Sequence, residues 1–189
     1  MNPQKKEEQV LVLDFLPHGK SGEATKEPQA QVVGEINFTL LEVVIRPGTQ
    51  LQAGMKIYIG RDERKEVDHI KQRINYPDLT TSAQNELQYA IKNIVKQREP
   101  EFVAFLNRAG PINIRSHMLE LLPGIGKKHL ESIVQVRGQK PFESFEDFHA
   151  RVPHVSSIED VFTQRILEEL RGESKYYLFV KSPKRETDY

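Results

Sequence analysis

The sequence NIRSHMLELLPGIGKKHLESIVQVRG, residues 113–138, carries the clearest structural signal of the chain. Asn113 is a residue type that often caps a helix, and the apolar spacing after it predicts a first helix. Two glycines in Pro123-Gly124-Ile125-Gly126 permit positive φ and close backbone approach, so we expect a sharp reversal there. A second helix is predicted to begin at once and to end before Gly138. The residues expected on the buried faces of these helices are Met118, Leu119, Leu122, Leu130, Ile133 and Val134.

The start of the second predicted helix is a candidate anion-binding site. Amides of a first helical turn lack intrahelical partners, and the helix dipole places positive charge at this end. Between residues 113 and 140 there are five basic and two acidic residues, a net charge of +3, whereas residues 141–173 carry −5. One end of this region is therefore expected to attract phosphate and the other to repel it. The candidate contacts are Gly124, Ile125, Gly126, Lys127, Lys128, Arg115, Arg137 and Lys140.

The order apolar-Pro-Gly-Ile-Gly resembles a helix-hairpin-helix motif. The segment KPFESFEDF, residues 140–148, is similar to the linker and third helix of the duplicated form, and Val152-Pro153-His154-Val155 lies where the second hairpin belongs. The resemblance covers residues 113–171 and implies binding to the sugar-phosphate backbone without reading of sequence. Since His154 and Ser156 replace the two hairpin glycines, we expect the second copy to be structural.

Residues 1–79 are predicted to form a small OB-like β-barrel. Alternating and β-branched apolar residues predict strands at 9–16, within 30–45 as a long or bent pair, within 50–60, and at 67–74. A polar loop at 17–30 contains Gly19-Lys20-Ser21, but a phosphate-binding loop would need glycine where Asp14 stands. We interpret this loop as flexible and able to contact a ligand. The candidate barrel contacts are Lys20, Arg46, Arg61 and Tyr58.

The remaining segments complete an α+β architecture. Residues 80–110 have helical periodicity interrupted at Glu99-Pro100 and are expected to connect the barrel to the helix-hairpin-helix domain at 111–172. Residues 173–189 are predicted to contain a strand at 175–180, able to rejoin the barrel, and a basic tail.

Composition excludes several classes of protein. The 189 residues include no cysteine, which excludes disulfides, thiolate metal sites and cysteine nucleophiles. No apolar run approaches the roughly 20 residues of a membrane span, and the N-terminus lacks the apolar stretch of a signal peptide. We therefore expect a cytoplasmic protein without membrane contact. Because 27 basic residues balance 27 acidic ones, any nucleic-acid contact must rest on a local patch.

The element order as a whole resembles an uncharacterised archaeal family that is described as RNA-binding, with an OB-like barrel joined to a helix-hairpin-helix unit. The similarity rests on residues 13–17, the Gly-Lys-Ser loop, residues 46–48 with 54–60, and residues 121–126. It implies a nucleic-acid-binding protein and favours RNA over DNA.

No pattern in the chain indicates an enzyme. The six histidines lack the spacing of a metal site, and nucleophile-elbow and dinucleotide-binding motifs are absent from the sequence. We expect no catalytic residue, metal or cofactor, although Asp14, Glu35, Glu42 and the acids of 62–68 could serve a metal-dependent nuclease. Three hypotheses follow: an RNA-binding protein, a DNA-binding accessory to repair or replication, and an adaptor whose acidic 141–173 face recruits a basic protein.

Overall fold

The computed structural model describes residues 6–20, 22 and 26–181. These residues form two compact units. The sheet unit comprises the described residues up to Ala90 together with those from Glu169 on, and the helical unit comprises Ile91–Glu168. Among the described residues, none of the helices has the length and apolar character required to cross a lipid bilayer.

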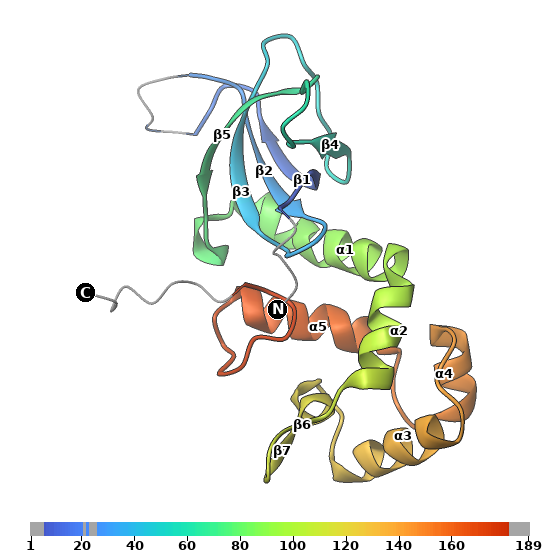
Figure 1. Ribbon diagram of the computed structural model, residues 1–189. Helices are drawn as coiled ribbons and strands as arrows, with labels where there is room; N and C mark the ends of the chain where they lie inside the picture. Colours follow the sequence, from blue (N-terminus) through green and yellow to red (C-terminus); the bar gives the residue numbers. More distant parts are fainter. Residues whose placement is uncertain (1–5, 21, 23–25, 182–189) are drawn as a thin grey trace. The chain divides into compact units, whose positions relative to one another are not determined.

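The sheet unit contains five antiparallel strands in the order β4-β1-β2-β3-β5. Their bounds are β1 (Gln9–Leu16), β2 (Gln29–Gly34), β3 (Leu40–Ile45), β4 (Lys56–Tyr58) and β5 (Val67–Arg73). The sheet curls into a half-barrel (Figure 1). All the predicted strand regions of the N-terminal part contain strands, and β1 has the predicted bounds. The α+β class is thus confirmed.

Apolar side chains fill the concave side of the half-barrel. The alternation along β1 and β2 directs Val10, Val12, Ala30 and Val32 into one cluster, as the period of a strand requires. The same cluster includes Leu41, Val43, Ile45, Leu51, Ile57, Ile59 and Val67.

A polar seam joins the other side of β2 to the segment that follows β5. Gln31 is fully buried; its amide nitrogen donates to the Asp78 carbonyl at 3.0 Å and its oxygen accepts from the Thr80 amide at 2.8 Å. Thr80 Oγ1 donates to Asp14 at 2.6 Å and accepts from the Ala83 amide at 3.0 Å, so it caps helix α1 (Thr81–Gln97). The short 3₁₀ helix η1 (Tyr76–Asp78) leads into this cap.

The predicted C-terminal strand is not formed. Residues 173–181 are irregular, because the carboxylate of buried Glu169 accepts from three consecutive amides, those of Leu178, Phe179 and Val180, at 2.8, 3.0 and 2.9 Å. Amides of a strand point alternately to opposite sides, so they cannot converge on one carboxylate. The prediction of a strand at 175–180 was therefore wrong. The predicted basic tail beyond Lys181, like Ser21 of the 17–30 loop, lies outside the described residues.

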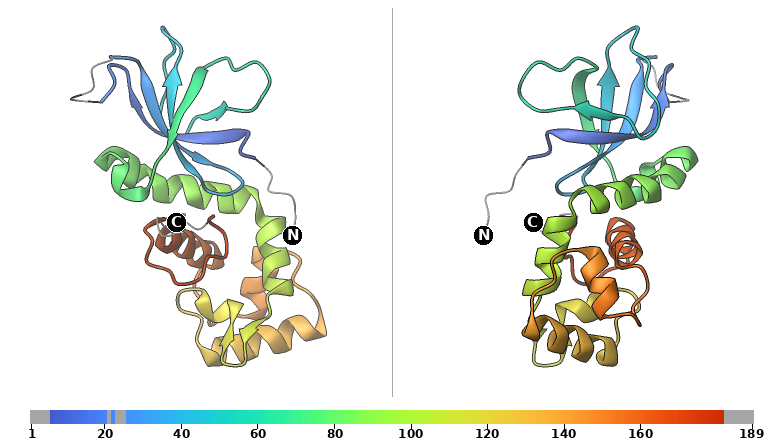
Figure 2. Two further views of the ribbon diagram at one scale, coloured as in Figure 1. Left: turned by 60° about the vertical axis from the view of Figure 1, so that its left-hand side comes forward. Right: turned by 90° about the vertical axis from the view of Figure 1, so that its right-hand side faces the viewer.

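The helical unit packs around phenylalanines. Phe162 lies 4.8, 5.9 and 6.2 Å, between ring centroids, from Phe102, Phe105 and Phe145. These rings come from helices α2 (Glu99–Arg108), α4 (Phe145–Arg151) and α5 (Ile158–Leu170). Between α2 and α4 the chain forms the hairpin β6 (Pro111–Asn113) and β7 (Ser116–His117), the 3₁₀ helix η2 (Met118–Leu121) and helix α3 (Lys127–Gln139) (Figure 2).

The helix predicted after Asn113 is replaced by this hairpin and η2. Asn113 Oδ1 accepts from the Arg115 amide at 2.8 Å, which closes a turn instead of capping a helix. His117 caps η2 instead: its Nδ1 accepts from the Leu119 amide at 3.1 Å. Helix α3 forms as predicted but continues through Gly138, and its Val134 remains 40% exposed, against the prediction that it is buried.

Candidate nucleic-acid interface

The residues Leu122-Pro123-Gly124-Ile125, hereafter the glycine turn, form a type II β-turn. The Ile125 amide donates to the Leu122 carbonyl at 3.1 Å, proline occupies the second position, and Gly124 has φ +78°. This φ favours glycine. Ile125 is 4% exposed, so its side chain anchors the turn in the core and is not available to a ligand.

Helix α3 begins directly after the glycine turn with an open N-terminus. Gly126 is the N-cap, with φ −90° and ψ −177°, and it has no side chain that could accept from the amides of the first helical turn. A Cβ at Gly126 would meet nothing within 4 Å. Unlike Gly124, Gly126 has a negative φ that any residue can adopt. The lack of a side chain at Gly126 leaves open space in front of the first amides of α3.

Lys127 and Lys128 extend this opening with positive charge. Both are exposed, and neither forms an ion pair with an acid in the described part of the chain. The first turn of α3 contains no acidic residue. His129 Nδ1 lies 2.9 Å from the Gly124 carbonyl. Because a carbonyl only accepts, Nδ1 carries the proton, and this hydrogen bond holds the turn against the helix.

Two arginines of the helical unit donate hydrogen bonds to backbone carbonyls. Arg165 is 6% exposed and donates to the Leu121 carbonyl at 3.0 Å, immediately before the glycine turn. Arg137 donates to the Leu106 carbonyl at 2.7 Å, and burial lowers the pKa of its guanidinium. Arg137, a predicted contact, thus serves the fold through this hydrogen bond. The pKa of His117 is lowered, mainly because His117 itself is partly buried and also because the positive charge of Arg137 lies nearby.

The two other predicted basic contacts lie at the surface. Lys140 forms an ion pair with Glu143 at 3.0 Å, with 62% of its side chain exposed. Arg115 is exposed in the loop of the β6–β7 hairpin. Next to it, Ile114 is fully exposed, with a relative exposure of 105%. Sequence reasoning did not single out Ile114, since an isoleucine inside a predicted helix gives no sign of its exposure.

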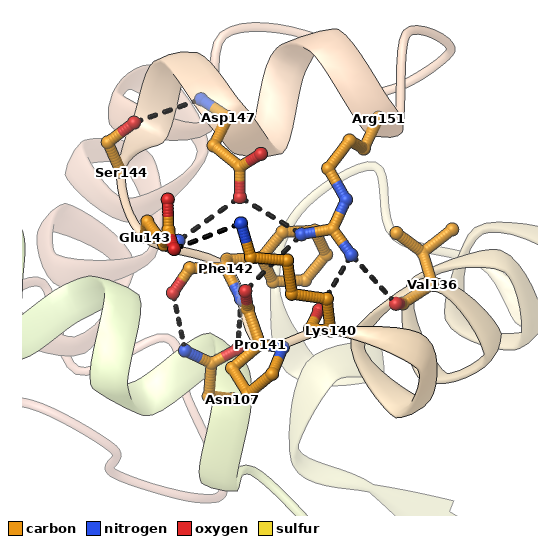
Figure 3. A network of polar contacts seen from close by, with 9 residues as sticks. All are labelled: Asn107, Val136, Lys140, Pro141, Phe142, Glu143, Ser144, Asp147 and Arg151. Atoms are coloured by element: carbon orange, nitrogen blue, oxygen red, sulfur yellow. Dashed lines mark hydrogen bonds and ion pairs between the residues drawn. The ribbon is translucent and has the colours of Figure 1, made fainter.

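The linker between α3 and α4 is fixed by a network that sequence reasoning also missed (Figure 3). Asn107 pairs with the backbone of Phe142: its Oδ1 accepts at 2.8 Å and its Nδ2 donates at 2.9 Å. Arg151 donates to the carbonyls of Val136 and Lys140, at 2.9 and 2.6 Å, and its guanidinium carbon lies 4.8 Å from the Phe142 ring centroid. The C-terminal end of α3 is thereby fixed to α4.

Arg151 also pairs with Asp147 at 3.0 Å within α4. The Glu143 amide donates to the same carboxylate at 3.1 Å, and this backbone hydrogen bond is the main reason why the pKa of Asp147 is lowered. Ser144 caps α4 by accepting from the Asp147 amide at 3.0 Å. The side chains of Asn107 and Arg151 serve a structural role in this network, because they bind backbone groups of the chain itself.

The residues Val152-Pro153-His154-Val155, hereafter the histidine turn, repeat the hydrogen bond of the glycine turn. The Val155 amide donates to the Val152 carbonyl at 3.3 Å. Phe38 is the only non-glycine residue with positive φ in the described part of the chain, so His154 does not have the conformation of Gly124.

The helix that follows the histidine turn has an occupied N-terminus. Ser157 Oγ accepts from the Asp160 amide at 3.4 Å and donates to Glu159 at 3.0 Å. Burial raises the pKa of Glu159, but hydrogen bonds from His149, its own backbone and Ser157 outweigh burial and lower it overall. Lys92 pairs with Asp160 at 2.7 Å and is the main cause of the lowered pKa of Asp160.

In the half-barrel, Lys20 is held by a buried acid. Its ammonium pairs with Glu42 of β3, which is 1% exposed and also accepts from Gln31 and Gln72. Burial raises the pKa of Glu42, yet the hydrogen bond from Lys20 and those from the two glutamines lower it overall. Lys20 therefore serves the fold in this structure.

The structure brings the other half-barrel candidates into one loop cluster. Arg46 Nε donates to the Arg64 carbonyl at 3.1 Å, and Arg64 Nε donates to the Gly60 carbonyl at 2.8 Å. The Tyr58 hydroxyl donates to Asp62 at 3.2 Å, and its ring covers Gly60 so closely that a Cβ there would collide with it. Arg61, in the same loop, is exposed.

Among the described residues, no group of three or more histidine and acidic side chains is arranged so that it could hold a metal ion. The acids considered for a nuclease include Glu42, which is paired with Lys20, and Asp14, which is paired with Thr80.

Comparisons with known proteins identify the family. Residues 6–181 match the model of a family described as a protein of unknown function, DUF655. The chain is 41% identical over 181 residues to the uncharacterized protein MJ0038 of Methanocaldococcus jannaschii, covering 95% of this chain and 82% of the relative. It is also similar to the crystal structure of Af1531 from Archaeoglobus fulgidus, described with the same family, at a TM-score of 0.87 and 46% identity over 93% of this chain and 100% of that one. The expectation of an uncharacterised archaeal family is thus confirmed, and the chain belongs to the DUF655 family.

Proposed function

We propose that this protein is a non-enzymatic nucleic-acid-binding protein that holds the sugar-phosphate backbone at the glycine turn and the N-terminus of α3. The single observation that carries the proposal is the open start of α3, where an uncapped helix end coincides with Lys127 and Lys128, both exposed and without an ion-pair partner among the described residues. Helix amides, the helix dipole and two ammonium groups all favour a bound anion at one point.

We interpret residues 111–172 as a duplicated helix-hairpin-helix domain and the half-barrel as OB-like. The equivalent hydrogen bonds of the glycine and histidine turns support the first interpretation. The curled five-stranded antiparallel sheet supports the second. In this interpretation only the glycine turn contacts phosphate, the loop cluster with Arg46, Arg61 and Tyr58 is an auxiliary surface, and RNA is favoured over DNA. Recognition would be of the backbone and not of base sequence.

The adaptor hypothesis receives less support from the acidic 141–173 segment. Six of its eight carboxylates have hydrogen-bond or ion-pair partners within the chain, which leaves fewer of them free to recruit a basic partner. The engaged acids are Glu143, Asp147, Glu159, Asp160, Glu168 and Glu169.

Fluorescence anisotropy with labelled single-stranded RNA, duplex RNA, single-stranded DNA and duplex DNA tests the proposal. Contact with two to four phosphates predicts that log affinity falls against log salt with a slope of about −2 to −4. Preference for either RNA form supports the RNA-binding hypothesis, and preference for duplex DNA supports the repair or replication accessory. Failure of all four probes to bind at low salt would exclude both.

The decisive variant is Lys127→Ala with Lys128→Ala, which should weaken binding at least about tenfold and reduce the salt slope. Its matched control is Lys96→Ala with Lys175→Ala, which removes the same charge from exposed positions outside the proposed interface. A folded Lys127/Lys128 variant that binds as tightly as the control would contradict the proposed grip.

A further inference from the structure

The tip of the β6–β7 hairpin presents an isoleucine to solvent. The register pairs Pro111 with His117 and Asn113 with Ser116, which leaves Ile114 and Arg115 as the loop. Ile114 has a relative exposure of 105%. The hydrogen bond from the Arg115 amide to Asn113 Oδ1 fixes the loop locally, so the exposure belongs to a defined turn.

Ile114 differs from the other exposed apolar residues of the chain. Among the described residues, Met55, Ile70 and Val134 are 38–40% exposed, and Tyr89, whose ring carries a polar hydroxyl, is 71% exposed, so each of them buries part of its surface. Ile114 buries none, although covering an apolar side chain of this size would stabilise a fold. A β-branched residue also contributes nothing to turn formation, where Gly, Asn, Asp and Ser are preferred. Neither the turn nor the core accounts for an isoleucine here.

The hairpin is attached to the proposed phosphate site through a short, well-fixed connection. The Met118 amide donates to the Gly110 carbonyl at 2.9 Å, which closes the base of the hairpin. His117 caps η2 and its amide donates to Glu120 at 2.9 Å. Helix η2 leads directly into the glycine turn and contacts both β7 and α3. The loop end projects freely from the helices of its unit (Figures 1 and 2).

We propose that Ile114 is a wedge that inserts at a base step of double-stranded nucleic acid while the glycine turn and α3 hold the adjacent backbone. Charge favours this partner, since residues 113–140 carry a net +3 and Arg115 lies beside the wedge. Apolar side chains such as isoleucine, inserted from the minor groove, partly unstack a base step and kink the duplex. An aliphatic side chain has no π face for stacking on single-stranded bases, so a base-paired partner is favoured.

This inference rests on the proposed function, and two different readouts test the wedge and the phosphate contact separately. Anisotropy reports binding, and 2-aminopurine, whose fluorescence rises when its base unstacks, reports the wedge. The probes are RNA and DNA duplexes of 16 base pairs, each set carrying one 2-aminopurine at a different central position. The protein should raise the fluorescence at one or more positions by about threefold, as expected for a partly unstacked step.

Ile114→Ala should bind within about tenfold of the unsubstituted protein, because the phosphate contacts remain, yet raise no 2-aminopurine fluorescence. Ile114→Met, a flexible apolar replacement, should retain the signal. Both substitutions are at a fully exposed side chain and leave the packing unchanged. Binding without unstacking, or equal unstacking by Ile114→Ala, would overturn the wedge and leave the phosphate grip standing. Binding to single-stranded probes without binding to any duplex would overturn the wedge alone, whereas absence of binding to single-stranded and duplex probes alike would overturn both proposals.

A tryptophan probe gives an independent check, because the chain has no tryptophan of its own. Emission from Ile114→Trp should be quenched about twofold or more on duplex binding, as contact with bases requires. The control is Tyr89→Trp, at a position on α1 that is 71% exposed, whose emission should stay unchanged. Quenching of both probes alike, or of neither, contradicts insertion of Ile114.

Discussion

The glycine turn and the histidine turn share a backbone hydrogen bond but are followed by helix starts of opposite character. Both place proline second, close with an amide-to-carbonyl hydrogen bond and precede a helix of 13 residues. The helix after the glycine turn begins with Gly126, Lys127 and Lys128, and its N-terminus is open. The helix after the histidine turn begins with Ser157, Ile158 and Glu159, and its N-terminus is occupied by its own side chains.

The contrast teaches that a helix end stays available to an anion only where the chain's own side chains leave its amides without a cap, and this is why we propose the site at α3 and not at α5. At α5, Ser157, Glu159 and Asp160 supply the acceptors and the negative charge that the helix dipole favours. At α3 no side chain does so, and the favourable charge has to come from elsewhere. Each prediction below changes one element of this contrast.

Reversing the charge of the α3 start should have the largest effect. Lys127→Glu with Lys128→Glu gives α3 the acidic first turn that α5 has, so we expect nucleic-acid affinity to fall on the order of a hundredfold and the salt slope to fall by about two. Anisotropy across a salt series measures both quantities. The same reversal at Lys96 and Lys175 should change affinity far less; equal losses in the two variants would reduce the effect to overall charge.

Replacing the glycine that has positive φ in the glycine turn should destabilise the fold. Gly124→Val forces a β-branched residue to φ +78°, which should destabilise the fold by about 1–2 kcal/mol. His154→Val at the matching position of the histidine turn requires no such conformation and should lie within about 0.5 kcal/mol of the unsubstituted protein. Urea unfolding followed by circular dichroism measures both. Equal stabilities of the two variants would mean that the turns do not differ in backbone strain.

Much of the fold followed from local patterns in the sequence. The alternation in Gln9–Leu16 predicted β1 with its bounds, and the Pro123-Gly124 pair predicted a reversal followed by α3. These features are local, because a period of two or a proline-glycine pair constrains its own backbone. The proposed contact residues Lys127 and Lys128 are exposed, as a surface role requires.

The failures came from residues whose role depends on distant partners. Asn113 has the same side-chain chemistry at a helix cap and at a turn, and here it closes a turn. The segment 175–180 has β-forming residues, but buried Glu169 draws its amides together. Arg137 counts as a surface charge in sequence, whereas in the structure it is half-buried and donates to the Leu106 carbonyl. No local pattern reveals such pairings.

Acid should weaken the occupied start of α5 through Glu159. Because the pKa of Glu159 lies below its ordinary 4.5 in the folded chain, ionised Glu159 stabilises the fold fully above pH 4.5, and this stabilisation is lost as pH falls through the lower folded value. Glu159→Gln should therefore be up to about 1 kcal/mol less stable at pH 7 and should converge with the unsubstituted protein as pH falls through the lowered folded pKa of Glu159. Urea unfolding from pH 7 to 3 tests this.

The control for Glu159 is Glu131→Gln, which neutralises an exposed acid of α3. Its stability should run parallel to that of the unsubstituted protein over the whole pH range. A Glu159→Gln deficit that persists unchanged at pH 3 would show that the carboxylate acts through packing and not through its charge.

The smallest expected effect gives the sharpest separation of stability from binding. Gly126 has the extended backbone of an N-cap and open space for a side chain, so the hydroxyl of Gly126→Ser can accept from an amide of the first turn of α3, as Ser157 does in α5. This should stabilise the fold by a few tenths of a kcal/mol. The same hydroxyl would occupy an amide proposed to bind phosphate, so affinity should fall about two- to fivefold.

The control variant Gly126→Ala adds the bulk of a side chain without the acceptor and should lower stability instead. Gly126→Ser could gain stability and keep full affinity, while Lys127→Ala with Lys128→Ala loses affinity. In that case the lysines alone hold the backbone, and the helix end is not part of the site.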